Sequence, residues 1–193
     1  MGQEKTDIGK PMCCAPGQLT ECAVNTDLKF NLPKAKQTVL GLYVTAAEAF
    51  EKWQLAPDKV IIIDVRTLEE FLFIGSPPMA WRIPVAVQSY EWNAEKQSFL
   101  MAPLPDFVSR VQSVAKPEDT IMVMCRSGGR SAIACNMLAQ AGFTNAYNIV
   151  DGMEGDGHGD SESQPKGGWK NTGCPWTKKI TPNQLVLPME PVQ

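Results

Sequence analysis

Two almost unbroken apolar runs, KVIIIDVR at 59–66 and TIMVMC at 120–125, constrain this fold more than any other feature. A continuous apolar run indicates a strand covered on both faces, because a strand with one face in water alternates apolar and polar residues. Helical patterns accompany these runs, including TAAEAFEKWQLA at 45–56 and the stretch from Ser131 to Ala141. Strands that alternate with helices predict an α/β fold, with a mostly parallel sheet flanked by helices.

Shorter patterns extend this prediction along the chain. Thr45 and Glu48 have the spacing of a helix capping box. The segment 76–103 is rich in proline and aromatic residues, which predicts a long excursion with one short strand near Trp81–Val85. The remaining expected elements are a strand at 39–44, a short helix at 67–75 with Leu68, Phe71 and Leu72 on its apolar side, an amphipathic helix at 104–115, and a strand and turn at 145–152.

Composition divides the chain into three parts. Residues 1–38 have little periodicity and several prolines, which predicts an extended N-terminal arm. Residues 39–155 form the predicted α/β domain. Residues 156–193 are expected to form a flexible acidic, glycine-rich loop and a tail that packs back on the domain through its tryptophans. Glycine, acid and serine dominate 151–168, which is typical of a mobile linker.

Charge and hydropathy exclude two classes of partner. The net charge is -3 and no long basic run occurs, so nothing in the sequence attracts nucleic acid. No apolar stretch reaches the roughly 18 residues that a membrane span needs. Cysteines in proline- and glycine-rich ends are more typical of an oxidising compartment, so we expect a periplasmic or exported protein, with the cytoplasm as the alternative.

The terminal cysteines are expected to form a disulfide rather than a metal site, because the single histidine, His158, stands alone in the glycine-rich loop. Their pairing is open from the sequence. The cysteines concerned are Cys13, Cys14, Cys22 and Cys174. A sixth, Cys135, lies in the predicted helix after the second apolar run, where core packing is favoured over a role as a resolving thiol. The acidic stretch at 151–160 lacks the spacing of an EF-hand calcium loop.

The stretch VMCRSGGRSAIA at 123–134 carries the candidate chemistry. Cys125 ends a predicted strand, and ligands of open α/β sheets bind at that end. A helix N-terminus and nearby arginines favour a thiolate, and glycines let the backbone curl around the sulfur. The pattern therefore predicts a nucleophile that acts on substrates bearing negative charge. The loop residues expected to surround Cys125 are Arg126, Ser127, Gly128, Gly129, Arg130 and Ser131.

Several of these side chains have two interpretations. Arg126 is expected at the mouth of the pocket, where it meets the anionic substrate, rather than at the solvated surface. Arg130 either binds substrate or, as we favour, anchors the loop through Asp64 or Glu70. Asp64 is expected to organise the loop as an ion-pair partner rather than to act in catalysis. Arg66 either attracts an anionic substrate or pairs with a glutamate at the surface, and Ser127 either donates to a bound sulfur or satisfies the backbone.

The motifs CRSGGRS, IIIDVRTLEEF, RIPVAV and GFTNAYNIVDGMEG resemble the rhodanese domain family over roughly residues 40–150. The resemblance implies a three-layer fold with a five-stranded parallel sheet. It implies that Cys125 takes sulfur from thiosulfate or polysulfide, that loop amides hold the persulfide, and that a thiol, cyanide or protein acceptor receives the sulfur. No metal or organic cofactor is implied.

Two alternatives accompany this resemblance. Cysteine phosphatases carry five residues between their cysteine and arginine, whereas four separate Cys125 from Arg130, which disfavours a phosphatase. Non-catalytic rhodanese-like binding modules usually lack the cysteine that is present here. The chain also has no match to the common G-H-I-P-G-A pattern. The corresponding GSPPMAWRIPV at 75–85 leaves the substrate open.

Overall fold

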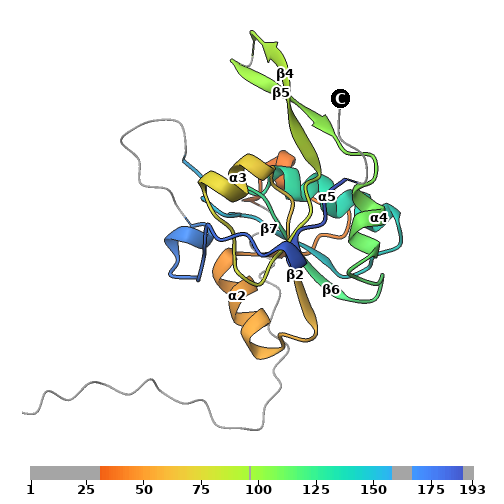
Figure 1. Cartoon of the computed structure of the whole chain (residues 1–193). Helices are drawn as coiled ribbons and strands as arrows, with labels where there is room; N and C mark the ends of the chain where they lie inside the picture. The colour runs from red at the N-terminus through yellow and green to blue at the C-terminus, as the bar shows by residue number, and fades with distance from the viewer. Residues whose placement is uncertain (1–30, 96, 158–166, 189–193) are drawn as a thin grey trace, which may run out of the picture.

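The computed structural model describes residues 31–95, 97–157 and 167–188, and its centre is a five-stranded parallel sheet (Figure 1). The strand order is β1-β7-β6-β2-β3, and every neighbouring pair runs parallel. The bounds are Tyr43–Val44 for β1, Val60–Asp64 for β2, Trp81–Arg82 for β3, Thr120–Met124 for β6 and Ala146–Ile149 for β7. The predicted α/β fold with a parallel sheet is confirmed. The two apolar runs lie side by side as β2 and β6 in its middle.

Helices cover both faces of the sheet and create a core on each side (Figure 1). On one face, α4 (Phe107–Gln112) and α5 (Gly129–Gln140) bury their apolar sides. On the other face, α2 (Ala46–Leu55) packs beside the fully buried Trp169 of the C-terminal tail. This double coverage explains why β2 and β6 are apolar along almost their whole length.

Capping boxes start two of the helices, and the sequence predicts the first of them. Thr45 caps α2, its hydroxyl accepting from the Glu48 amide while Glu48 accepts from the Thr45 amide. Thr67 and Glu70 repeat this arrangement at α3 (Leu68–Phe73). The predicted apolar side of α3 is correct for Phe71, which is buried, and wrong for Leu72, which is 52% exposed. Because α3 has only six residues, less than two helical turns, Phe71 is its one buried side chain.

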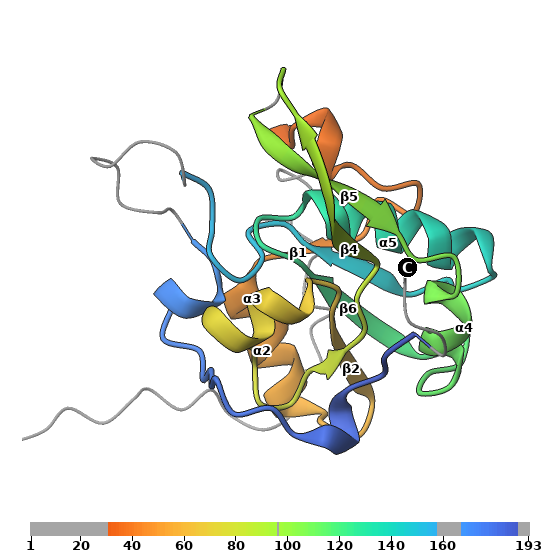
Figure 2. The same ribbon diagram turned by 45° about the horizontal axis from the view of Figure 1, so that its top comes forward.

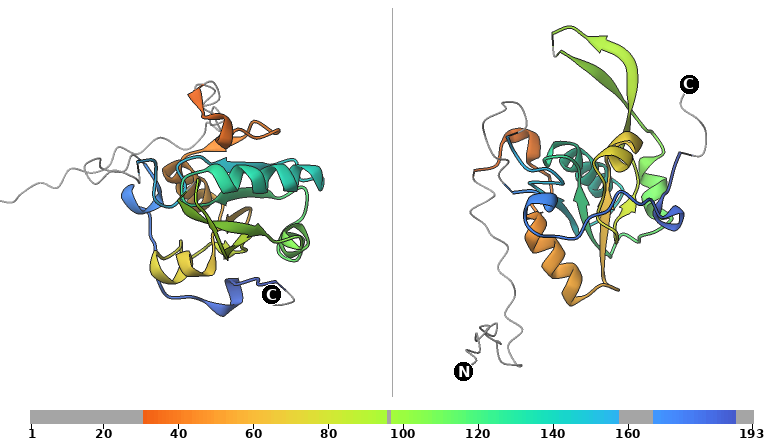
Figure 3. Two further views of the ribbon diagram at one scale, coloured as in Figure 1. Left: turned by 90° about the horizontal axis from the view of Figure 1, so that it is seen from above. Right: turned by 60° about the vertical axis from the view of Figure 1, so that its left-hand side comes forward.

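The segment 76–103 contains more structure than its sequence suggests. After β3, a two-stranded antiparallel ribbon of β4 (Ala86–Asn93) and β5 (Ser98–Pro103) projects from the domain (Figures 1 and 3). Most of its residues are exposed or half-buried, so it lacks the alternation of a strand that covers a core. The strand expected at 39–44 is shorter than predicted, because Gly41 has a φ of +63° and leaves only Tyr43–Val44 in β1.

The C-terminal tail packs on the domain through one of its tryptophans. Trp169, in the short helix η2 (Trp169–Asn171), is fully buried and donates to the Pro175 carbonyl, whereas Trp176 is 42% exposed. Further along, Thr177 forms a bridge with Ser76, and the residues after η3 (Pro182–Gln184) pair with Arg82 at the outer edge of β3 (Figure 2).

The linker predicted over 151–168 is wrong for its first part. Gly152, Met153 and Gly155 are buried, and Met153 donates its amide to the Cys125 carbonyl at 2.8 Å. The glycine- and acid-rich composition therefore does not predict a mobile linker here, since the glycines permit this segment to pack closely against the loop after β6. Residues 158–166, including His158, lie outside the described residues, as do Cys13, Cys14 and Cys22.

Within the three described ranges, the longest helices fall short of the length and apolar character that crossing a membrane requires.

Candidate functional site

The loop between β6 and α5 holds Cys125 at the carboxyl edge of the sheet. Its Sγ accepts from the Gly128 amide at 3.2 Å. Gly128 caps α5 with a φ of +99°, and a Cβ there would overlap the Val150 carbonyl oxygen, so the position requires glycine. We expected several loop amides to converge on the sulfur; among the described residues, only the Gly128 amide makes that bond to Sγ. Cys125 itself is only 2% exposed.

A buried asparagine that the sequence analysis missed fixes the other side of the loop. Asn148 of β7 donates its amide hydrogens to the Gly128 carbonyl at 3.0 Å and to the Lys36 carbonyl at 2.9 Å. Its Oδ1 lies 2.7 Å from the Ser131 hydroxyl, which also lies 3.4 Å from Cys125 Sγ. The Ser131 hydroxyl has one hydrogen, so it donates to one of these two acceptors at a time. A polar residue within the buried pattern of β7 was the available signal.

The end of the N-terminal arm supports the same loop. Lys36, in the short helix η1 (Lys34–Lys36), is buried, and its ammonium donates to the Val150 carbonyl at 2.8 Å. It also forms an ion pair with the largely exposed Asp156, with a nitrogen–oxygen distance of 2.7 Å. The arm thus contacts the candidate site through its last residues.

The two loop arginines differ in their surroundings. Arg130 makes two bonds of 2.6 Å to the carboxylate of Glu70 at the start of α3, whereas Arg126 is exposed. Burial acts to raise the pKa of Glu70, but the hydrogen bonds and charge of Arg130 outweigh it and hold that pKa below its ordinary value. Of the two anchors considered for Arg130, the structure pairs it with Glu70 and not with Asp64.

Replacing Glu70 with glutamine is expected to lower the free energy of unfolding at pH 7 by about 2 kcal/mol, because the partly buried Arg130 loses a charged partner. The lowered pKa means that this stabilisation is complete above the ordinary value of 4.5 and is lost as the pH falls through the pKa of the folded state. Denaturant unfolding of both proteins from pH 7 to pH 3 measures this. A constant difference across that range contradicts the prediction.

Asp64 and Arg66 form a buried ion pair beneath the loop. Both side chains are fully buried, and the guanidinium binds the carboxylate at 2.9 Å and 2.7 Å. The Ser76 hydroxyl also donates to Asp64 at 2.8 Å, and Arg66 donates to the Gly75 carbonyl. The surface pairing considered for Arg66 is therefore wrong. It packs within the protein and joins the end of β2 to the turn after α3.

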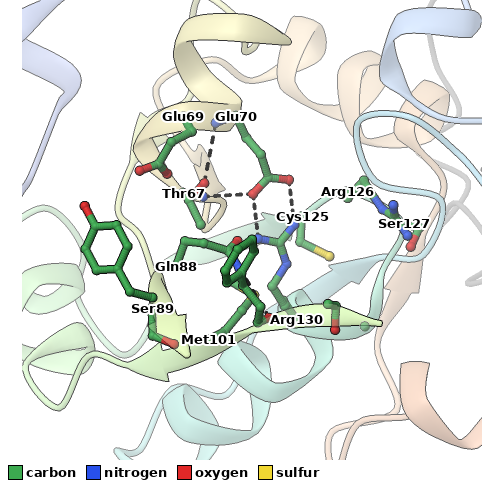
Figure 4. Close-up of a pocket in the computed structure, with 14 residues that line it drawn as sticks. Thr67, Glu69, Glu70, Gln88, Ser89, Met101, Cys125, Arg126, Ser127 and Arg130 are labelled. Atoms are coloured by element: carbon green, nitrogen blue, oxygen red, sulfur yellow. Dashed lines mark hydrogen bonds and ion pairs between the residues drawn. The ribbon is translucent and has the colours of Figure 1, made fainter. Parts of the chain in front are cut away.

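A cavity of about 810 Å³ opens above Cys125, between α3, the β4–β5 ribbon and the loop (Figure 4). It is lined by five of the predicted site residues: Cys125, Arg126, Ser127, Gly129 and Arg130. The other four do not line it: Gly128 and Ser131 lie beside Sγ, and Asp64 and Arg66 form the buried pair at the end of β2. Of the lining residues outside the loop, the sequence singles out Glu70, as a possible anchor of Arg130. The others were not predicted, namely Thr67, Glu69, Gln88, Ser89, Tyr90, Ser98, Phe99 and Met101.

The other described cysteines lie away from this cavity. Cys135 of α5 is completely buried, and burial together with the charge of Cys125 raises the pKa of its thiol far above the ordinary range. Such a thiol packs as an apolar group and is a poor nucleophile. Cys174 is a buried free thiol, so the structure does not place it in a disulfide. No cluster of three or more metal-ligating side chains occurs within residues 31–95, 97–157 and 167–188.

Comparisons with known proteins agree with this geometry. A family model described as a rhodanese-like domain matches residues 46–156. An uncharacterised protein of Rickettsia conorii is 32% identical over 122 residues, which span 63% of this chain and 86% of that protein. A chloroplastic thiosulfate sulfurtransferase of Arabidopsis thaliana is 38% identical over 90 residues, covering 47% and 68% respectively. A crystal structure from M. tuberculosis has a TM-score of 0.55 at 26% identity, covering 70% of this chain and 96% of that one.

Proposed function

This chain belongs to the rhodanese-like domain family, and from that premise we propose that it is a sulfurtransferase that carries sulfur as a persulfide on Cys125. The observation that carries the proposal is the position of Cys125 Sγ, which accepts from the Gly128 amide at the N-terminus of α5 and lies in the lining of a large cavity. A helix N-terminus and an amide donor both stabilise a negative sulfur. The similarity to the Arabidopsis thiosulfate sulfurtransferase supports thiosulfate as donor, with polysulfide as the alternative.

In the proposed reaction, the Cys125 thiolate attacks the outer sulfur of thiosulfate. A new bond forms between Sγ and that sulfur, and the electron pair of the broken sulfur–sulfur bond leaves with sulfite. A thiolate or cyanide acceptor then attacks the outer sulfur of the persulfide, and Cys125 returns as a thiolate. Arg126, exposed at the mouth of the cavity, attracts the anionic donor.

The surroundings of Arg130 favour this reaction over phosphate ester hydrolysis. Its guanidinium already forms two short hydrogen bonds with Glu70, so it is not available to bind a phosphate through two parallel hydrogen bonds. Glu69 and Glu70 also put carboxylates in the lining of the cavity. A binding module without catalysis would have no need of a thiol placed under an amide donor and a helix N-terminus.

Treating the protein with thiosulfate is expected to add one sulfur atom (~32 Da) to its intact mass, lost on adding cyanide or a thiol. The cyanide reaction should yield thiocyanate, and aryl phosphate serves as the control substrate. Absence of a mass gain with thiosulfate and with polysulfide would contradict the proposal. Aryl phosphate turnover that depends on Cys125 would replace it with a phosphatase.

A further inference from the structure

One wall of the cavity comes from the β4–β5 ribbon, which packs against the core at its base through Ala86. The ribbon is held at its base, where Leu104 donates its amide to the Val85 carbonyl at 2.9 Å and both side chains are buried. Beyond this base, the two strands pair chiefly with each other. Figure 4 draws Gln88 and Met101 of the ribbon, Arg130 of the loop and the two glutamates of α3 in the lining of this one cavity.

A break in the strand pairing lies within the part of the ribbon that lines the cavity. Gln88 pairs with Met101 and Trp92 with Phe99, so three residues of β4 lie opposite the single residue Leu100 of β5. Bulges of this kind bend a strand and redirect its side chains. Residues on both sides of the break line the cavity, namely Gln88, Ser89, Tyr90, Ser98, Phe99 and Met101.

This wall presents apolar surface that the folded protein leaves uncovered. The Tyr90 side chain is fully exposed (101%), and Phe99 is 48% exposed although its ring packs edge-on against Trp92 at 5.1 Å. Leu72 and Phe73 of α3 are exposed as well, and helical spacing puts Phe73 on the same side as the cavity-lining Glu69. Clustered exposed apolar residues beside a cavity indicate a surface that is covered when a ligand binds.

The size and charge of the cavity exceed what a small sulfur anion needs. A volume of about 810 Å³ is within the range of sites for organic ligands, whereas thiosulfate occupies on the order of 100 Å³. Two arginines and two glutamates line the cavity, so their formal charges cancel before the thiolate is counted. The space beside the ribbon therefore has no strong preference for an anion and offers an apolar contact instead.

We propose that the β4–β5 ribbon is an acceptor subsite, which binds the apolar body of a thiol that removes sulfur from Cys125. The ligand class is a thiol on an aromatic or aliphatic body, either a free organic thiol or a cysteine flanked by apolar residues in a peptide. This inference rests on the proposed function. The acceptor thiolate, after losing its proton to solvent, attacks the outer sulfur of the persulfide. The acceptor leaves as a persulfide and Cys125 regains the thiolate.

The experiment separates loading from unloading. Cys125 is loaded with thiosulfate and checked by intact mass, and the loss of the added sulfur is then timed in single turnover. The acceptors are 2-mercaptoethanol, 2-phenylethanethiol, acetyl-Gly-Cys-Gly-amide and acetyl-Leu-Cys-Phe-amide, each corrected for its rate with a free persulfide. We expect each apolar acceptor to unload the protein at least about ten-fold faster than its small partner.

The matched variants are Phe99→Ser and Leu100→Ser, which alter neighbouring residues of β5. Phe99 lines the cavity and Leu100 does not, and both side chains are exposed, so neither change should unfold the domain. Phe99→Ser is expected to remove most of the rate advantage of the apolar acceptors over their small partners. Leu100→Ser is expected to stay within about two-fold of the wild type for all four acceptors.

Equal corrected rates for small and apolar acceptors, or equal losses in the two variants, would overturn the subsite. Faster unloading by the Leu-Cys-Phe peptide than by phenylethanethiol identifies a protein cysteine as the acceptor, and the reverse order identifies a free thiol; each supports the subsite. A wild-type protein that gains no mass at the loading step contradicts the proposed function instead, so the two failures are distinguishable.

Discussion

Replacing Cys125 with serine is expected to abolish the mass gain with thiosulfate and to reduce thiocyanate formation at least about 10³-fold. A serine hydroxyl stays protonated at neutral pH, so the Gly128 amide and the N-terminus of α5 have no anion to stabilise. Serine differs from cysteine only by an oxygen in place of the larger sulfur, so it fits the same site. The hydrogen bonds of Asn148 and Lys36 that support the loop are retained. Intact mass and a thiocyanate assay measure the two effects, with a thermal unfolding curve to verify the fold.

The other buried thiols provide matched controls for this change. Cys135→Ala and Cys174→Ala each remove a buried free thiol outside the cavity lining. Both are expected to keep the mass gain, even where the lost packing lowers stability by about 1 kcal/mol. If Cys135→Ala loses the mass gain while Cys125→Ser keeps it, the carrier has been assigned to the wrong sulfur.

The second large effect is expected on stability. Asp64→Ala should lower the free energy of unfolding by about 3–5 kcal/mol, because it leaves the fully buried Arg66 without its anion. The Ser76 hydroxyl loses its acceptor in the same change. Urea unfolding at neutral pH measures the loss.

Two further proteins control this prediction. Asp156→Ala removes a largely exposed acid, and its partner Lys36 keeps its hydrogen bond to the Val150 carbonyl, so the change should cost about 1 kcal/mol or less. The double change Asp64→Ala with Arg66→Met should recover part of the loss, since no buried charge is then left unpaired. Equal costs for Asp64→Ala and Asp156→Ala would show that burial does not set the strength of the inner pair.

The parts of the fold that the sequence predicts depend on local patterns. The apolar runs of β2 and β6 follow from burial on both faces, and the capping box at Thr45 follows from spacing within one helical turn. The position of Cys125 at a strand end needs only the order of strand, loop and helix. Each of these features is contained in a few consecutive residues.

The parts that the sequence does not predict depend on distant contacts. Asn148 joins residues that are 112 and 20 positions away, and Lys36 reaches Val150 across 114. Both sequence interpretations of Arg66 leave its side chain accessible. Its burial depends on the turn after α3, which folds back over it. The ribbon wall of the cavity has no core side, so its strands lack the periodicity that identifies a strand.

The C-terminal tail pairs with β3, and this pairing limits where the chain can be truncated. The family match ends at residue 156, but Val186 donates its amide to the Arg82 carbonyl at 3.0 Å, and Trp169 fills the core beside α2. A fragment that ends at residue 156 lacks Trp169, which would leave a cavity in the core beside α2. It would also leave the hydrogen-bonding edge of β3 uncovered, and bare sheet edges recruit other chains into aggregates. The smallest fragment suited to expression therefore extends beyond the tail's contact with β3.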